Sequence, residues 1–170
     1  RSFPNGYTNA PTGGNSTHVL YLEEKNGVAR PVVVAGHAAR WDVVKAEEFR
    51  SGWPEGIDFT SKKRDADRAF FIWSDVNDDG KVQVEEVSWL PKDPGGMTVM
   101  PDLSLCAARL GGKATRFAPS SLTETGVPKY DINAGEVRAE GVEGPRSSGG
   151  DQILATDDGQ TVLSLGIAPF

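Results

Sequence analysis

Hydrophobic residues occur along the chain in short runs separated by turn residues, and the first clear pair of runs predicts a tight hairpin. Residues 18–35 (HVLYLEEKNGVARPVVVA) contain Asn26-Gly27, a pair typical of two-residue type I′ turns. Folding about this turn places Glu23 opposite Arg30, with apolar pairs further from the tip. Because apolar side chains point to both faces near the base, we expect the sheet to be covered on both sides.

The last apolar runs predict a second hairpin. Residues 152–167 (QILATDDGQTVLSLGI) fold about Asp158-Gly159, which places Leu154 opposite Leu163. No long helix alternates with these strands, so a doubly wound α/β fold is not expected. The 20 glycines and 11 prolines also favour a turn-rich chain. The expected fold class is therefore mostly β, built of antiparallel hairpins, with a sandwich, a barrel or propeller blades as the alternatives.

Shorter elements are predicted between the two hairpins. They are a short helix over 41–49, a strand over 70–73, a helical turn over 85–90 that Pro91 ends, and two strands within 97–119 joined near Gly111-Gly112. Residues 1–17 are polar and rich in Gly, Asn, Thr and Pro, so we expect a flexible N-terminal arm. Residues 18–170 are then expected to form a single β-rich domain.

One segment carries a specific chemical pattern. Asp75–Glu86 (DVNDDGKVQVEE) matches the 12-residue calcium loop of EF-hand proteins. This pattern has side-chain oxygens at positions 1, 3, 5 and 9, glycine at 6, a backbone carbonyl at 7 and glutamate at 12, and calcium binds six to eight such hard oxygen atoms. We therefore predict a Ca²⁺ site. Its expected ligands are Asp75, Asn77, Asp79, the backbone carbonyl of Lys81, Gln83 and Glu86.

The elements around this loop indicate its role. A predicted strand precedes the loop and a short helical turn follows it. The sequence holds no second loop of this kind, because Asp157-Asp158-Gly159 lacks a downstream glutamate. A sensor of the EF-hand type needs a pair of helices that open when calcium binds. We therefore expect a structural ion that fixes a long connection to the sheet.

The segment from Phe71 to Val87 (FIWSDVNDDGKVQVEEV) resembles a calcium-loop insertion in secreted bacterial β-propeller proteins of the NHL or SMP-30-like kind. Their pattern is W-x-D-x-N-G-D-G-x-x-Q-x-E-E, and this chain departs from it at Asp78, where the family has glycine. Looser matches extend the resemblance over Tyr21 to Asp131. The resemblance implies blades of about 40–45 residues, so the chain would hold about four. Because such propellers generally have more blades, other chains or segments would complete the ring.

Charge and composition narrow the possible partners. The formal net charge of −6 argues against nucleic acid and anionic membranes. No apolar stretch approaches the roughly 20 residues of a membrane-spanning helix. Cys106 is the only cysteine, so an intrachain disulfide and a cysteine-based zinc site are excluded, and its apolar neighbours predict a buried thiol.

The sequence contains none of the usual catalytic or phosphate-binding motifs, so no catalytic residue is assigned. His37 lies close to Asp42 in sequence, so a His–Asp pair is an alternative to a simple loop histidine. Trp73 and Trp89 flank the calcium loop and are expected in the core. Trp53 lies in a loop rich in Gly and Pro and is the candidate for an exposed aromatic residue that stacks on sugars.

These observations favour a non-catalytic, calcium-stabilised binding or scaffold module of β-propeller type, with a protein or a glycan as partner. We expect the protein to be secreted or periplasmic, because calcium outside the cytoplasm is abundant enough to fill a modest site. One alternative is a hydrolytic enzyme of SMP-30-like or glycosidase type, which requires a second carboxylate-rich site. Another is a dockerin-like assembly module, which usually has two such loops with following helices.

Overall fold

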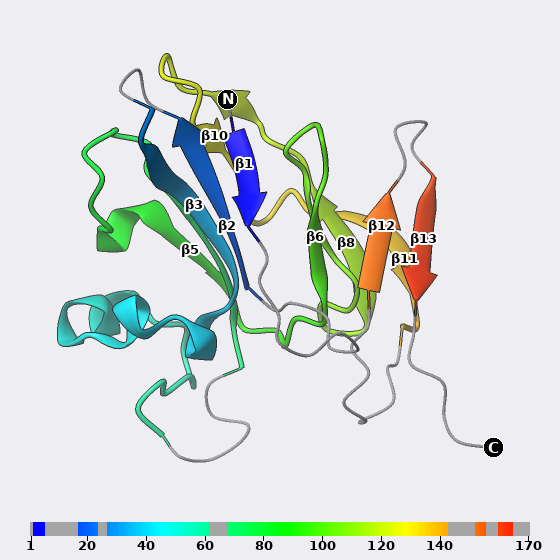
Figure 1. The fold of residues 1–170 in the computed structure, drawn as a ribbon. Coiled ribbons are helices and arrows are strands. Elements are labelled where there is room, and N and C mark those ends of the chain that lie inside the picture. The colour runs from blue at the N-terminus through cyan, green and yellow to red at the C-terminus, as the bar shows by residue number, and fades with distance from the viewer. Residues whose placement is uncertain are drawn as a thin grey trace.

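The computed structural model describes residues 2–5, 17–23, 27–61, 68–142, 152–155 and 160–164. Within these ranges the chain is mostly β, and its paired strands are antiparallel. A five-stranded sheet has the order β1-β2-β3-β4-β5, so each strand lies beside the next one in sequence (Figure 1). Its strands are β1 (Ser2–Asn5), β2 (Thr17–Glu23), β3 (Ala29–His37), β4 (Phe70–Ser74) and β5 (Val87–Leu90).

The later part of the described chain forms a four-stranded sheet in the order β11-β8-β7-β6, together with two small two-stranded sheets. The four strands are β6 (Met97–Val99), β7 (Leu105–Ala107), β8 (Lys113–Phe117) and β11 (Glu136–Glu140). The small sheets pair β9 (Ser121–Leu122) with β10 (Pro128–Lys129) and β12 (Gln152–Ala155) with β13 (Thr161–Ser164). Among the described strands, neither large sheet closes into a barrel.

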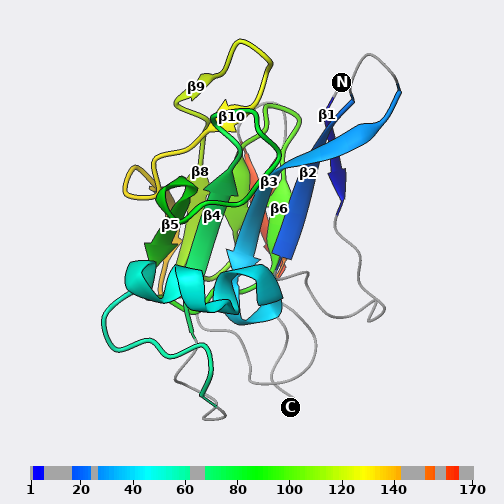
Figure 2. The ribbon, with the colours of Figure 1, turned by 90° about the vertical axis from the view of Figure 1, so that its left-hand side faces the viewer.

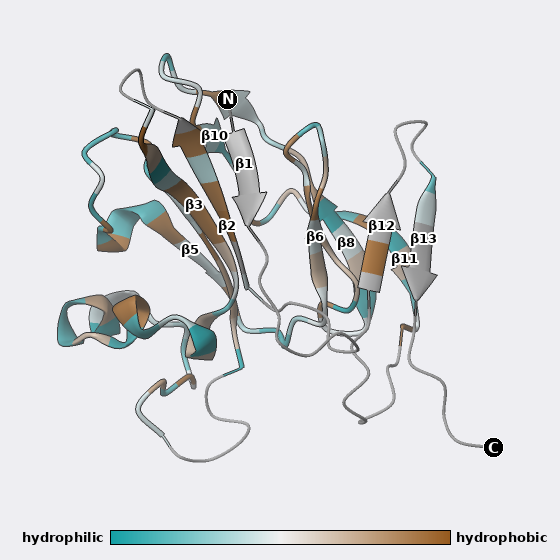
Figure 3. Cartoon of the chain, in the orientation of Figure 1, coloured by the Kyte–Doolittle hydropathy of each residue, from teal (hydrophilic) through white to brown (hydrophobic). Residues whose placement is uncertain are grey.

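The two large sheets face each other across a hydrophobic core. Successive residues of a strand point to opposite faces, and on β4 this rule sends Phe70 and Ile72 toward the four-stranded sheet. The ring of Phe70 stacks on the ring of Phe117 from β8, with centroids 5.3 Å apart. Hydrophobic residues accordingly line β2 and β3, whereas the loop that enters β5 is mostly hydrophilic (Figure 3).

The other face of the five-stranded sheet is covered by three short 3₁₀ segments (Figure 2). Val44 and Phe49 from these segments are buried in one cluster with Phe71 and Trp73 of β4. The prediction that both faces are covered is therefore confirmed. The single short helix expected over 41–49 is replaced by separate 3₁₀ segments. They are η1 (Ala38–Arg40), η2 (Asp42–Lys45) and η3 (Glu47–Gly52).

The first hairpin forms as predicted, but its register changes partway along. Near the base, Val19 lies opposite Val34, as expected. A bulge then shifts the pairing, so Arg30 lies opposite Leu22 and the predicted Glu23–Arg30 pairing is wrong. The extra residue is Val32, next to Pro31, which has no N–H to donate to the ladder and is tolerated inside a sheet chiefly at such irregularities. This shift matters for function, because it changes the position of Arg30.

The second hairpin is also confirmed with a shifted register. Leu154 lies opposite Val162 and not opposite Leu163, so the predicted pairing is off by one residue. The predicted turn at Asp158-Gly159 lies outside the described residues. The arm expected over 1–17 contains β1, which pairs with β2 at the edge of the sheet. Its residues 6–16 lie outside the described ranges.

Two further predictions need correction around the centre of the chain. The strand expected over 70–73 is confirmed as β4. The helical turn expected over 85–90 is limited to η4 (Val84–Glu86), and β5 follows at once. The region 97–119 holds three strands where two were expected. None of the helices in the described ranges is long and apolar enough to cross a membrane.

Candidate metal centre

The predicted calcium loop connects two adjacent antiparallel strands, β4 and β5. Trp73 near the end of β4 lies opposite Val87 at the start of β5, so the two ends of the loop are held close together. The N–H of Asp75 donates to the carbonyl of Val32 at 2.9 Å, which extends the pairing with β3 by one residue. The sheet therefore positions the loop ends, as two flanking helices do in an EF-hand.

Asp75, at loop position 1, is fully buried, with 0% of its surface exposed. Its Oδ1 accepts a hydrogen bond from the N–H of Asp79, and its Oδ2 accepts one from the N–H of Gly80, both at 3.1 Å. Gly80 has φ +72°, a left-handed conformation that glycine adopts without a steric penalty. The tight turn at position 6 thus aims two backbone donors at the buried carboxylate, which offsets its loss of hydration.

The side chains at positions 3, 5 and 9 are joined by hydrogen bonds. Asn77 donates from Nδ2 to Oε1 of Gln83 at 2.9 Å, and Gln83 donates from Nε2 to Oδ2 of Asp79 at 2.8 Å. Asn77 Oδ1 and Asp79 Oδ1 also accept backbone N–H groups two residues further along the loop, at 3.1 and 2.8 Å. The side chains of Asn77, Asp79 and Gln83 are therefore joined in one hydrogen-bonded group.

Glu86, at position 12, is held by residues at the N-terminal end of the loop. Its Oε2 accepts a hydrogen bond from the indole Nε1 of the buried Trp73 at 3.1 Å. Its Oε1 lies 3.4 Å from the donor N–H of Asn77. Val82, at position 8, is partly buried against the hydrophobic cluster beneath the loop. The two hydrogen bonds orient the carboxylate of Glu86 at the C-terminal end of the loop.

Arg30 is the residue that the sequence analysis missed. Its guanidinium forms one ion pair with Oδ2 of Asp75 and another with Oδ1 of Asp78. Burial lowers the pKa of Arg30, but the charges and hydrogen bonds of both carboxylates outweigh this effect and raise the pKa overall. The sequence signal for this contact was Pro31, because the bulge there moves Arg30 out of register with Glu23.

The residues present fit calcium in their identity, spacing and mutual contacts. Half of the predicted ligands are amide or backbone oxygens, so the loop differs from a site built of His, Cys, Asp and Glu alone. Indeed, no three such side chains in the described ranges form a compact metal-binding group. The departure from a simple calcium loop is Arg30, which already binds Asp75.

Other candidates from the sequence have structural roles. Trp73 and Trp89 pack in the core cluster, as predicted. Trp53 is not an exposed platform for sugars: its indole Nε1 donates to the carbonyl of Val44 at 2.9 Å, and its ring meets Phe59 edge-on at 4.9 Å. It is therefore half-buried, and most of its aromatic surface serves the fold.

The surroundings of His37 and Cys106 also differ in part from those predicted. His37 Nε2 lies 3.5 Å from Asp93 Oδ1, so its acidic neighbour is not Asp42. Its Nδ1 accepts the N–H of Ala39 at 3.2 Å, which caps η1. Cys106 is buried, as predicted, and burial raises its pKa to about 11. Its thiol therefore stays protonated at neutral pH and is a poor nucleophile.

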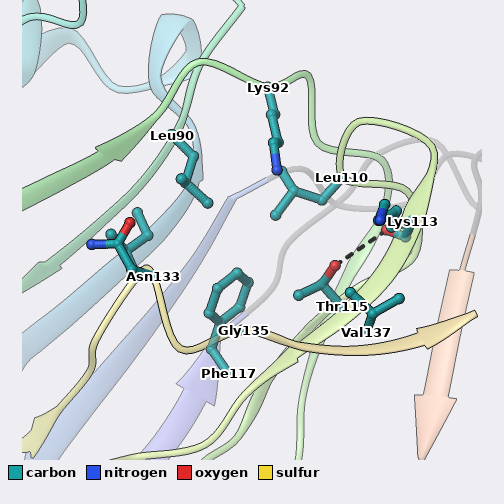
Figure 4. A pocket seen from close by; sticks show the side chains of 10 residues that line it. Leu90, Lys92, Leu110, Lys113, Thr115, Phe117, Asn133, Gly135 and Val137 are labelled. Atoms are coloured by element: carbon teal, nitrogen blue, oxygen red, sulfur yellow. Dashed lines mark hydrogen bonds between the residues drawn. The ribbon is translucent and has the colours of Figure 1, made fainter. Parts of the chain in front are cut away.

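A separate cavity of about 200 Å³ lies beside the four-stranded sheet (Figure 4). Apolar side chains such as Phe117 and Leu110 form much of its wall, and Lys92 and Lys113 are its only charged lining residues. The main chain at Gly135 lies against this wall: a Cβ there would come within 2.6 Å of the Phe117 ring. The cavity thus combines apolar side chains with polar ones and positive charge, in a chain whose net charge is −6.

Comparisons with known proteins identify no relative. No protein-family model matches the chain, and no curated protein or solved structure matches it either. The loop and the sheets that hold it are therefore the features from which a function is proposed.

Proposed function

We propose that this chain is a calcium-stabilised β module of an extracytoplasmic protein, in which the ion fixes the β4–β5 connection and the sheets bind or support a partner. The carrying observation is the set of hydrogen bonds that link Asp75, Asn77, Asp79, Gln83 and Glu86 in a loop whose ends are joined by the sheet. The partner class we retain is a protein or a glycan, as the sequence suggested.

The architecture supports this proposal over the dockerin-like alternative. In a propeller, four-stranded antiparallel sheets surround a central channel, and neighbouring blades pack face to face. The contact between the two large sheets is compatible with this arrangement and also with a sandwich. A dockerin-like module needs helices after its loops, whereas a strand follows this one. No observation in the described ranges favours a hydrolytic enzyme.

Calcium is expected to stabilise the folded protein. If the loop binds with a Kd of about 0.5 mM, as modules exposed to extracellular calcium do, 10 mM calcium adds about 1.8 kcal/mol to the free energy of unfolding. For a chain of 170 residues this corresponds to a Tm increase of about 4–7 °C relative to EDTA. Thermal unfolding followed by circular dichroism measures this difference.

The matched variants are Glu86→Gln and Glu85→Gln, which remove the same charge at neighbouring positions. Glu86 is a predicted ligand with two fixed oxygen atoms, whereas Glu85 is exposed. We expect Glu86→Gln to abolish most of the calcium-dependent increase in Tm and Glu85→Gln to retain it. Equal calcium responses in both variants, or no response in the unchanged protein, would contradict the proposal.

The cavity in Figure 4 supports a second candidate function, the binding of a small organic anion with an apolar body. Its volume corresponds to about six or seven water molecules, which suits a compact ligand. An apolar wall with a few polar groups at its edge is typical of small-molecule sites. Lys113 is paired with Glu140 at 2.6 Å, so Lys92 is the lysine that we expect to meet the ligand's charge.

Saturation-transfer NMR tests this second candidate with hexanoate and its uncharged counterpart hexanol as probes. We expect transfer to hexanoate, at least threefold weaker transfer to hexanol, and a similar loss for hexanoate in Lys92→Gln. The matched control is Lys129→Gln, which removes a lysine that does not line the cavity. Equal signals from both probes, or no signal from hexanoate, would exclude this function.

A further inference from the structure

The ion pairs of Arg30 give the loop a cation that belongs to the protein itself. Arg30 comes from β3, 45 residues before Asp75 in sequence. Only 20% of its side chain is exposed, and the Asp75 carboxylate that it binds is completely buried. Its second ion pair is with Asp78, which is partly exposed and is not a predicted ligand. The guanidinium therefore bridges a ligand carboxylate and a neighbouring carboxylate.

This arrangement changes the charge balance of the loop. Carboxylates held close together repel one another unless a cation compensates them. Five carboxylates and two cationic side chains give the loop and Arg30 together a formal charge of −3. The residues counted are Asp75, Asp78, Asp79, Glu85, Glu86, Arg30 and Lys81. Of the two cations, Arg30 forms the ion pairs with Asp75 and Asp78, so it offsets much of this repulsion without a metal.

We propose that Arg30 is an internal cation that keeps the loop folded without calcium and lowers the affinity of the loop for calcium. This inference rests on the proposed function, because it concerns the same site. A cation bound to one oxygen of Asp75 would lie about 5–6 Å from a guanidinium bound to the other oxygen. The two positive groups repel each other, so Arg30 raises the calcium concentration at which the site fills.

Arg30 thus sets the calcium concentration above which the site fills. By Coulomb's law, a divalent and a monovalent cation at this distance repel each other even at the dielectric constant of water. This repulsion weakens the affinity of the loop for calcium about tenfold. A site weakened in this way stays empty at the low calcium levels of a cytoplasm and fills at millimolar calcium. The loop would nevertheless be ordered before calcium arrives, because the Arg30–Asp75 pair needs no metal.

Isothermal titration with calcium and thermal unfolding in EDTA test the two parts of this inference. We expect Arg30→Gln to bind calcium about tenfold more tightly than the unchanged protein, and to unfold in EDTA at a Tm lower by about 5 °C or more. The matched control is Arg40→Gln, the same substitution at an exposed arginine of η1 that lies outside the loop. It should change the affinity less than threefold and leave the Tm in EDTA nearly unchanged.

Arg30→Lys provides a second variant in case Arg30→Gln does not fold. It keeps the charge but loses the fork that binds two carboxylates at once, so both effects should be intermediate. Calcium affinity that is unchanged or weaker in Arg30→Gln would overturn the inference and leave the proposed function standing. If neither protein binds calcium, the proposed function fails and the affinity part of this inference fails with it. A lower Tm in EDTA would then still show the internal ion pair.

Discussion

Asp75→Ala is expected to lower the free energy of unfolding by about 3–5 kcal/mol even in EDTA, because the substitution breaks a buried ion pair. The carboxylate accepts the N–H groups of Asp79 and Gly80 and binds the guanidinium of Arg30, and 0% of its surface is exposed. Removing it leaves two backbone donors and a half-buried cation without this partner. Urea unfolding at neutral pH, followed by tryptophan fluorescence, measures the loss.

The matched control is Asp78→Asn, which removes the other carboxylate that binds Arg30. Asp78 is partly exposed and has φ +64°, a conformation that asparagine tolerates. We expect a loss of less than about 1 kcal/mol, as for most exposed ion pairs. If Asp75→Ala lowers the free energy of unfolding in calcium but not in EDTA, then Asp75 serves only to bind the metal.

Gly135→Ala is expected to cost about 2–3 kcal/mol, because it inserts a methyl group where none fits. The added Cβ would lie 2.6 Å from Cε1 of Phe117 and 2.7 Å from Cγ2 of Thr115. Phe117 is buried and stacked on Phe70, so its ring is held between the two sheets and cannot move aside freely. The same urea titration measures the effect, which should appear with and without calcium.

Gly126→Ala is the control for this second prediction, because it tests backbone strain without steric conflict. Gly126 has φ +93°, and a Cβ there would meet no atom within 4 Å. Its cost should be about 1 kcal/mol, from the left-handed conformation alone. A smaller loss in Gly135→Ala than in Gly126→Ala would contradict the close packing of the Gly135 backbone on Phe117.

The periodic parts of the sequence predicted the hairpins and the strand β4 because alternation and turn residues are local signals. The stretch after the loop was misjudged as helical. Val87 and Trp89 pair with Trp73 and Phe71 of β4. That pairing with β4, across the 12-residue loop, made the short segment extended, which local propensity does not reveal.

In the candidate site, too, the local features were predictable from the sequence and the contact with a separate strand was not. Its predicted ligands follow from spacing within 12 residues, and in the structure the side chains of Asn77, Asp79 and Gln83 contact one another. A hairpin with one register throughout places Arg30 opposite Glu23, but the bulge beside Pro31 shifts that register. Proline inside a strand often marks such an irregularity. Here the bulge beside Pro31 changes the position of Arg30, whose guanidinium binds Asp75.

The central claim is that the loop between β4 and β5 closes around calcium. Anomalous diffraction from crystals grown in 10 mM calcium chloride tests it most directly. We predict an anomalous peak surrounded by oxygen atoms at about 2.3–2.6 Å, with Arg30 at the edge of the site. The expected ligands are Asp75, Asn77, Asp79, the Lys81 carbonyl, Gln83 and Glu86. An ordered loop with no such peak, and with Arg30 as the sole cation at Asp75, would contradict the account.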